Sequence, residues 1–323
     1  MNRSKLINSV LVAGFLLAIS FSVYYYIQAS DYQKKIDDAT SQADLPTYHF
    51  VLIGEEMDHD YWRLVGEGAK AMEEKEDVFV EYEGPKRSNP DEQLKLLDMA
   101  VKSKVDGIIV QALNEDFLPV IDQAVEEGIP VITIDTDAPE SKRSTYIGTD
   151  NYEAGRLAGE TLLADTDGTA TVGIITGSFE NAHHQLRVEG FKDAIKEASD
   201  IKIVAVEESN ITRVNAEEKA YQMLNNHPDI TALYGTSALD GIGMVAASET
   251  LGRADSLYII AFDTLSPNID LLEQGKMDAL ISQKPYEMGH RSVELMLNLM
   301  AGKEVESVYH TSRSVVRKGD VHD

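Results

Sequence analysis

The stretch that decides the fold is IPVITIDT, residues Ile129–Thr136. Its β-branched core, Val131–Ile134, follows Pro130 and runs directly into Asp135. An apolar run this short favours a buried parallel strand over a helix. In an open parallel sheet, ligands bind just beyond the carboxyl ends of the strands, so we expect Asp135 to lie at a ligand-binding edge.

The same junction of strand and carboxylate occurs again in the second half of the chain. There the run YIIAF, Tyr258–Phe262, ends on Asp263. A single aspartate after a strand commonly caps a helix or shapes a turn. Because the junction is duplicated, we favour the interpretation that Asp135 and Asp263 hold a polar small molecule between two lobes.

The composition narrows the classes of partner and site. The chain has 323 residues, which leaves room for two hydrophobic cores. Its net charge is −26, from 55 acidic and 29 basic residues, and such a surface repels nucleic acid, so no nucleic-acid partner is expected. Cysteine is absent, which excludes disulfides, thiolate metal sites, a cysteine nucleophile and a lipidated N-terminal cysteine.

The N-terminal residues predict the compartment. The uncharged run Val10–Ile27 follows Arg3 and Lys5, and at the helical rise it would extend about 27 Å, close to the thickness of a hydrocarbon core. Basic residues on the short side place the rest of the chain outside the cytoplasmic membrane. We expect residues 1–29 to be a signal anchor and residues 30–46 a tether. The alternative is a cleaved signal peptide and a secreted protein.

From Tyr48 onward, strand-like runs alternate with helical segments. Asn89 predicts the start of one such helix, because Pro90 occupies its first position. A second series of alternating segments begins at Ala170–Thr176, ATVGIIT. Regular alternation of this kind predicts parallel α/β sheets with right-handed crossovers, and the length after the tether fits two similar halves.

Several motifs, in their order along the chain, carry a resemblance to a known family. They are VDGIIVQ, EEGIPVITIDTD, YIGTDNYEAGRLAGE, RVEGF at Arg187–Phe191, NNHPDITALYGTS, IIAFDT, and ISQKPYEMG at Ile281–Gly289. From about Tyr48 to Lys318 the chain resembles the type I periplasmic binding proteins, in the ribose/galactose-binding branch that shares its fold with the ligand domains of LacI-type repressors.

This resemblance implies an α/β fold of two doubly wound parallel-sheet lobes, with the ligand in the cleft between them. Three crossovers would join the lobes, near Thr149–Asn151, Ser282–Lys284 and His310–Ser312. The first lobe would then contain residues 47–150 and 284–311, and the second residues 151–283 and 312–323.

The resemblance also implies a set of ligand-binding residues. They are His59, Tyr61, Trp62, Asp135, His183, Gln185, Arg187, Ser237, Asp263 and Gln283. Aromatic faces suit the C–H face of a sugar ring, and carboxylates and amides suit its hydroxyls. Ile211 stands where the family has a second-lobe aromatic residue, and Ser237 replaces a sugar-binding asparagine. These departures leave the particular sugar open, with a pentose such as xylose or ribose favoured.

Other patterns are weaker. His183 and His184 are neighbours and would diverge by about 100° on a helix, so no metal site is expected there. The string Gly241–Ala246, GIGMVA, matches a dinucleotide fingerprint but falls inside a predicted helix and not in the turn that the fingerprint requires. Asp135 and Asp263 have no recognisable water-activating partner. We therefore predict no catalytic residues, no metal and no cofactor.

The sequence thus predicts an extracytoplasmic monosaccharide-binding protein, not an enzyme, that closes on its sugar and presents the closed form to a membrane partner. The stretch LIGEEMDHDYWRLV resembles membrane-anchored sugar sensors, which slightly favours a histidine kinase sensor domain as the partner. An ABC permease is the alternative. A LacI-type repressor and a secreted sugar-processing enzyme are remote alternatives, since the repressor would need an N-terminal helix-turn-helix.

Overall fold

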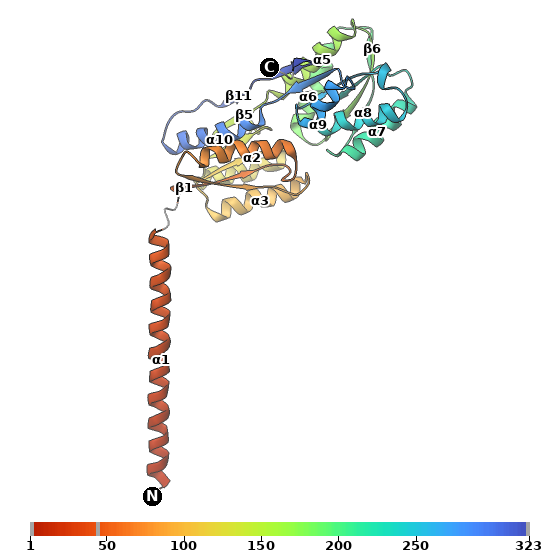
Figure 1. The fold of residues 1–323 in the computed structure, drawn as a ribbon. Helices are drawn as coiled ribbons and strands as arrows, with labels where there is room; N and C mark the ends of the chain where they lie inside the picture. The colour runs from red at the N-terminus through yellow and green to blue at the C-terminus, as the bar shows by residue number, and fades with distance from the viewer. Residues whose placement is uncertain (1–2, 43–45, 321–323) are drawn as a thin grey trace. The chain divides into compact units, whose positions relative to one another are not determined.

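The computed structural model describes residues 3–42 and 46–320. The chain divides into two units, Met1–Thr47 and Tyr48–Asp323 (Figure 1), and each is described by itself. The first unit contains the helix α1, Arg3–Gln42, which continues through most of the expected tether. In the described part of the chain, none of the helices combines the length and the hydropathy that a membrane span requires.

The second unit contains two six-stranded sheets. The first has the order β11-β5-β4-β3-β1-β2, with β1 at Tyr48–Ile53, β2 at Val78–Glu83, β3 at Gly107–Val110, β4 at Val131–Ile134, β5 at Thr145–Gly148 and β11 at Val308–His310. The second has the order β12-β10-β9-β8-β6-β7, with β6 at Ala170–Thr176, β7 at Ile201–Glu208, β8 at Ala232–Gly235, β9 at Tyr258–Phe262, β10 at Ala279–Ser282 and β12 at Ser314–Val316. The two orders are equivalent, and every pairing is parallel except that of β10 with β12.

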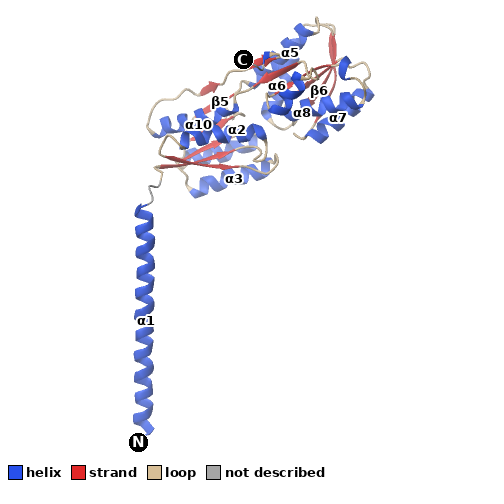
Figure 2. Cartoon of the chain, viewed as in Figure 1, coloured by secondary structure: helices blue, strands red, loops and turns tan. Residues whose placement is uncertain are grey.

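Helices cover both faces of each sheet (Figure 2). Those packed on the first sheet are α2 at Asp60–Glu73, α3 at Pro90–Ser103, α4 at Leu118–Glu126 and α10 at Pro285–Met300. Those packed on the second are α5 at Asn151–Asp165, α6 at Ala182–Ile195, α7 at Arg213–Asn226, α8 at Ala238–Thr250 and α9 at Ser266–Glu273. Short 3-10 helices lie at Glu115–Phe117 and Ala254–Ser256. We call the first sheet with its helices lobe 1 and the second with its helices lobe 2.

The chain passes between the lobes at three places. It leaves lobe 1 after β5, returns between β10 and α10, and crosses again between β11 and β12. The predicted fold class, two parallel-sheet α/β lobes of the type I periplasmic binding kind, is therefore confirmed. The glycines of the fingerprint-like string lie within α8, as expected.

Local sequence explains how the elements near the cleft are fixed. Asn89 Oδ1 accepts the backbone N–H of Glu92 at 3.1 Å and so caps α3. Helices α5 and α6 approach closely at two glycines. A Cβ on Gly155 would lie 2.1 Å from the carbonyl oxygen of Arg187, and one on Gly190 would lie 2.0 Å from that of Tyr152. This contact fixes the position of α6, and with it Arg187.

Candidate ligand-binding site

A pocket lies between the two lobes, at the carboxyl ends of both sets of strands. Its lining consists of Glu55, Glu56, His59, Tyr61, Trp62, Asp135, His183, His184, Arg187, Ile211, Ser237, Ala238, Asp263 and Gln283. Nine of the ten predicted site residues are in this set; Gln185 is not. The strands of two separate sheets thus converge on one site, as expected for a ligand held between lobes.

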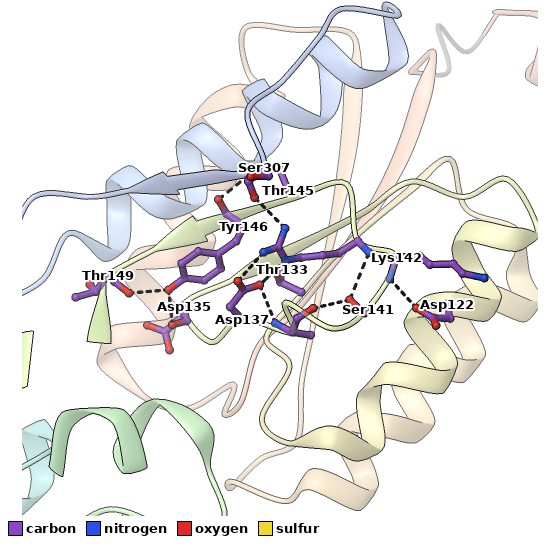
Figure 3. A network of polar contacts seen from close by, with 12 residues as sticks. Asp122, Thr133, Asp135, Asp137, Ser141, Lys142, Thr145, Tyr146, Thr149 and Ser307 are labelled. Atoms are coloured by element: carbon purple, nitrogen blue, oxygen red, sulfur yellow. Dashed lines mark hydrogen bonds and ion pairs between the residues drawn. The ribbon is translucent and has the colours of Figure 1, made fainter. Parts of the chain in front are cut away.

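The backbone at Asp135 is held in an uncommon conformation. Its φ is 63°, in the left-handed region, which aspartate tolerates better than most residues. Its carbonyl oxygen accepts the side-chain amide of Asn151 at 3.0 Å and lies 2.9 Å from the hydroxyl of Tyr146. The Tyr146 hydroxyl points between the Asp135 and Thr149 carbonyls (Figure 3). The first crossover, at Thr149–Asn151, therefore fixes the strand-end carboxylate.

The side chain of Asp135 is buried and already has partners within lobe 1. Its Oδ1 accepts the hydroxyl of Tyr61 at 2.5 Å, and its Oδ2 accepts the side-chain amide of Gln111 at 2.9 Å. Burial raises the pKa of Asp135, while nearby Arg187 and these hydrogen bonds act in the opposite direction. A ligand hydroxyl reaching Asp135 would thus meet a carboxylate whose orientation is fixed.

Arg187 lines the pocket beside two of the crossovers between the lobes. Its Nη2 donates to Gln283 Oε1 at 2.9 Å, its Nε donates to Asn151 Oδ1 at 2.9 Å, and its guanidinium lies 4.1 Å from the ring centroid of Phe262. Gln283 Oε1 also accepts the hydroxyl of Thr149 at 2.9 Å. Residues of two crossovers therefore meet at one buried arginine, whose planar, permanently charged group suits such a junction.

Asp263 is the counterpart of Asp135 in lobe 2. It too has a left-handed backbone, with φ of 72°. Its Oδ1 accepts the side-chain amide of Gln283 at 2.7 Å. Burial raises the pKa of Asp263 to about 6, against the opposing influence of Arg187. Gln283 thus joins Arg187 to Asp263 through one side-chain amide.

The two histidines at the start of α6 both reach the pocket, and the prediction that they diverge is wrong. Their ring centroids lie 4.0 Å apart. His183 Nδ1 lies 2.8 Å from the Thr136 hydroxyl in lobe 1, and His184 Nδ1 lies 2.9 Å from the Thr236 hydroxyl in lobe 2. Each imidazole turns to a threonine hydroxyl at the pocket, and these two contacts hold the rings of the neighbouring residues close together. Burial lowers the pKa of both imidazoles well below the ordinary value, so both are neutral at pH 7.

The aromatic residues after β1 form the wall of the pocket in lobe 1. Tyr61 and Trp62 pack edge to face, with ring centroids 5.8 Å apart, and both are buried. The Trp62 ring rests against the backbone of Gly54, where an added Cβ would lie 2.6 Å from a ring carbon. His59 caps α2 by accepting the Tyr61 backbone N–H at 3.1 Å.

Three residues of the second lobe have roles that differ from a simple ligand contact. Gln185 does not line this pocket: its side chain lies on the outer side of α6, is exposed, and donates to the Phe179 carbonyl at 2.6 Å. Ser237 lines the pocket, and its hydroxyl also caps α8. Ile211 lines it with a left-handed backbone, φ 51°, which is rare for a β-branched residue.

Two polar residues near the site, the acidic Glu55 and the amide Gln111, were not identified from the sequence. Glu55 lines the pocket, and burial raises its pKa to about 7. Gln111 directly follows β3 and holds Asp135. Each comes within two residues of a strand end, so the rule that pointed to Asp135 would have found both had it been applied to every strand.

Comparison with known proteins agrees with this arrangement. The profile of the periplasmic binding protein domain matches residues 50–304. GanP, a glucose-galactose binding protein from Geobacillus stearothermophilus, is 54% identical, with a TM-score of 0.83 over 85% of this chain and 99% of that one. A chain of the XylFII-LytSN complex is 35% identical, with a TM-score of 0.81 over 84% of this chain and 98% of that one.

A D-ribose/D-allose-binding protein of Pseudomonas aeruginosa is 28% identical over 265 residues, which cover 79% of this chain and 83% of that protein. The domain match spans most of the chain, and the two lobes carry the strand-end site at the expected place. The chain belongs to the periplasmic binding protein family.

Proposed function

We propose that this protein binds a monosaccharide in the pocket between its lobes and releases it unchanged. One observation carries the proposal: the strand-end carboxylates Asp135 and Asp263, one from each lobe, line one pocket, where Tyr61 holds Asp135 and Gln283 joins Asp263 to Arg187. Carboxylates and amides of fixed orientation suit the vicinal hydroxyls of a sugar, and the adjacent aromatic wall at Tyr61 suits its C–H face.

An aldose in its ring form is the ligand that this arrangement favours. GanP, with 54% identity, is described as a glucose-galactose binding protein, so glucose and galactose are the first candidates. The ribose/allose-binding relative supports the wider aldose class, and the pentoses xylose and ribose stay as predictions from the sequence. Ile211 supplies an aliphatic side chain to this pocket, which changes its shape relative to one with an aromatic residue there.

A thermal-shift panel tests the proposal. The full chain is heated with D-glucose, D-galactose, D-xylose, D-ribose or D-allose, and with acyclic mannitol as a control. A ligand at 100 times its dissociation constant stabilises the folded state by about 2.7 kcal/mol. We expect at least one ring-forming aldose, but not mannitol, to raise the melting temperature, and NMR to recover that sugar unchanged. A panel without any shift would reject sugar binding in this pocket.

We further propose that the protein works outside the cytoplasmic membrane and that a membrane partner recognises its closed form. A ligand shifts the population of lobe arrangements by its differential affinity for them, and a partner can read that shift. The structural similarity to a chain of the XylFII-LytSN complex slightly favours a sensor domain of a histidine kinase as the partner. An ABC permease is the alternative.

The partner can be identified by capture from solubilised membranes with the tagged protein, in the presence and absence of the sugar found above. Sugar-dependent recovery of a histidine kinase would support the sensor role. Recovery of transport subunits would support the permease instead.

A further inference from the structure

Asn181 occupies the N-cap position of α6 but does not cap it. Its backbone is extended, with φ of −79° and ψ of 122°, as in an ordinary N-cap residue, yet its side chain makes no capping hydrogen bond. Asparagine is among the residues that cap helices best, and a lost cap costs about 1 kcal/mol. The side chain of Asn181 is therefore engaged elsewhere.

Its partner lies in the other lobe. Asn181 Nδ2 donates to Glu55 Oε1 at 2.8 Å, and the same oxygen accepts the hydroxyl of Ser88 at 2.8 Å. Asn181 and Glu55 are 2% and 6% exposed, so this bond is shielded from water in the structure, whose arrangement of bonded lobes we call closed. Ser88, from lobe 1, orients the carboxylate toward lobe 2.

The two residues after Asn181 also contact lobe 1. The backbone N–H of Ala182 donates to the Leu113 carbonyl at 2.9 Å, and His183 Nδ1 lies 2.8 Å from the Thr136 hydroxyl. Three consecutive residues at the start of α6 thus bridge the lobes, and among the described residues Asn181 lies outside the pocket lining.

We propose that Asn181 and Glu55 form an interlobe latch, in which Asn181 is a positioning residue that sets how strongly the lobes hold the closed arrangement without itself contacting the sugar. When the lobes part, Asn181 can turn its Oδ1 to the free N–H groups of the first turn of α6. One side chain then exchanges a bond across the cleft for a helix cap. The link to sugar affinity rests on the proposed function; the link to lobe closure does not.

The latch can be tested by measuring the distance between the lobes. Because the chain has no cysteine, Lys95→Cys on α3 and Lys196→Cys after α6 give two unique spin-label sites in opposite lobes, both exposed. In the sugar-free full chain at pH 9, where Glu55 with its pKa of about 7 is charged, Asn181→Asp should shift the distance distribution toward longer distances, because the introduced aspartate caps α6 well and repels Glu55. Asn298→Asp, in the last turns of α10, is the matched control and should leave the distribution unchanged.

A swap variant makes the test specific to this pair. In Glu55→Gln combined with Asn181→Asp, the introduced glutamine can donate its amide to the introduced aspartate, which restores the cross-lobe bond with reversed polarity. We expect the swap to recover the shorter distances. If Asn181→Asp leaves the distribution unchanged, or if the swap fails to recover it, the latch is wrong.

The second arm uses the sugar identified by the thermal-shift panel. Asn181→Asp should weaken its binding about tenfold, the scale of one hydrogen bond to a charged group less the regained helix cap. The change should be in the dissociation rate, and unchanged affinity would overturn the link to binding. If no sugar binds the wild-type protein, the proposed function fails, while the distance measurements still decide whether the latch exists.

Discussion

Asp135 and Asp263 occupy the same position in the two lobes, and both adopt a left-handed backbone, with φ of 63° and 72°. Each follows an equivalent strand, β4 or β9, and each donates its backbone N–H to the next strand along the sheet, at Ile147 and Ile281. A left-handed backbone costs about 1–2 kcal/mol for an ordinary residue. Its occurrence at both strand ends indicates that the chain maintains this geometry for the site.

The first prediction separates backbone from side chain at Asp263. Asp263→Gly should be more stable to urea than Asp263→Ala by about 1 kcal/mol, because glycine adopts a positive φ freely and alanine does not. Both variants lack the carboxylate, so both should bind the sugar weakly. If Asp263→Ala is more stable than Asp263→Gly, the positive φ at position 263 does not destabilise a residue that has a Cβ, and this prediction is wrong.

The second prediction concerns Gly54 and the only tryptophan. Gly54→Ala would place a Cβ within 2.6 Å of the Trp62 ring, so the ring must shift. We expect a destabilisation of about 1–3 kcal/mol, as for other overpacked cores, together with a red shift of the indole emission as Trp62 gains exposure. Gly302→Ala is the control for glycine loss, because a Cβ there meets nothing within 4 Å, although its φ of 69° adds backbone strain. Its emission should match the wild type.

The third prediction concerns Arg187 at the junction of the crossovers. Arg187→Lys keeps the charge but cannot reach Asn151, Gln283 and the Thr236 carbonyl together, as the guanidinium does. Each hydrogen bond to a charged group contributes about 1.5–3 kcal/mol. We therefore expect the lysine variant to lose at least about 1.5 kcal/mol of unfolding free energy and a similar amount of sugar-binding free energy. Wild-type behaviour of the lysine variant in both measurements would contradict the assigned role.

The fourth prediction is a pH dependence that arises from Glu55. Its pKa of about 7 in the folded protein exceeds the ordinary value of 4.5, so the folded state holds this proton more tightly than the unfolded chain. The stability from this group is therefore fully present below pH 4.5, is lost as the pH rises toward 7, and is constant above. Burial is the main cause of the raised pKa, and the charges of Asp135 and Glu56 raise it further. The hydrogen bonds from Ser88 and Asn181 lower it.

The measurement compares the wild type with Glu55→Gln, which cannot ionise. From pH 5.5 to 8, the stability of the wild type should fall by about 2 kcal/mol relative to the variant. The comparison between the two proteins is needed because the buried His183 and His184, whose pKa values are lowered, give the opposite slope below pH 6.5. A difference that does not change with pH would show that Glu55 titrates normally.

Much of the fold could be predicted from the sequence because its signals are local. The β-branched run before Asp135 and the Asn89-Pro90 helix start predicted elements that the structure contains at those positions. The duplicated strand-to-aspartate junction predicted two lobes. These features depend on residues close together in the chain, where periodicity and capping preferences are informative.

The site was harder to predict where it depends on packing across lobes. A helical projection alone separated His183 from His184, although the first turn of α6 brings both rings together. Gln185 was named through the family resemblance alone; at about 100° per residue it projects about 200° from Arg187, which agrees with its exposed position on the outer side of that helix. The contact between Asn181 and Glu55 joins residues 126 positions apart, so no local sequence pattern predicts it.

The most direct test of the central claim is a calorimetric titration of the full chain with D-glucose and D-galactose, in parallel with Asp263→Asn. We predict saturable binding of one sugar per chain for at least one of the two. We also predict that its affinity falls roughly 10- to 150-fold in the variant, which keeps the shape and backbone preference of aspartate but lacks its charge. Equal affinity in the two proteins would contradict a site built on the strand-end carboxylates.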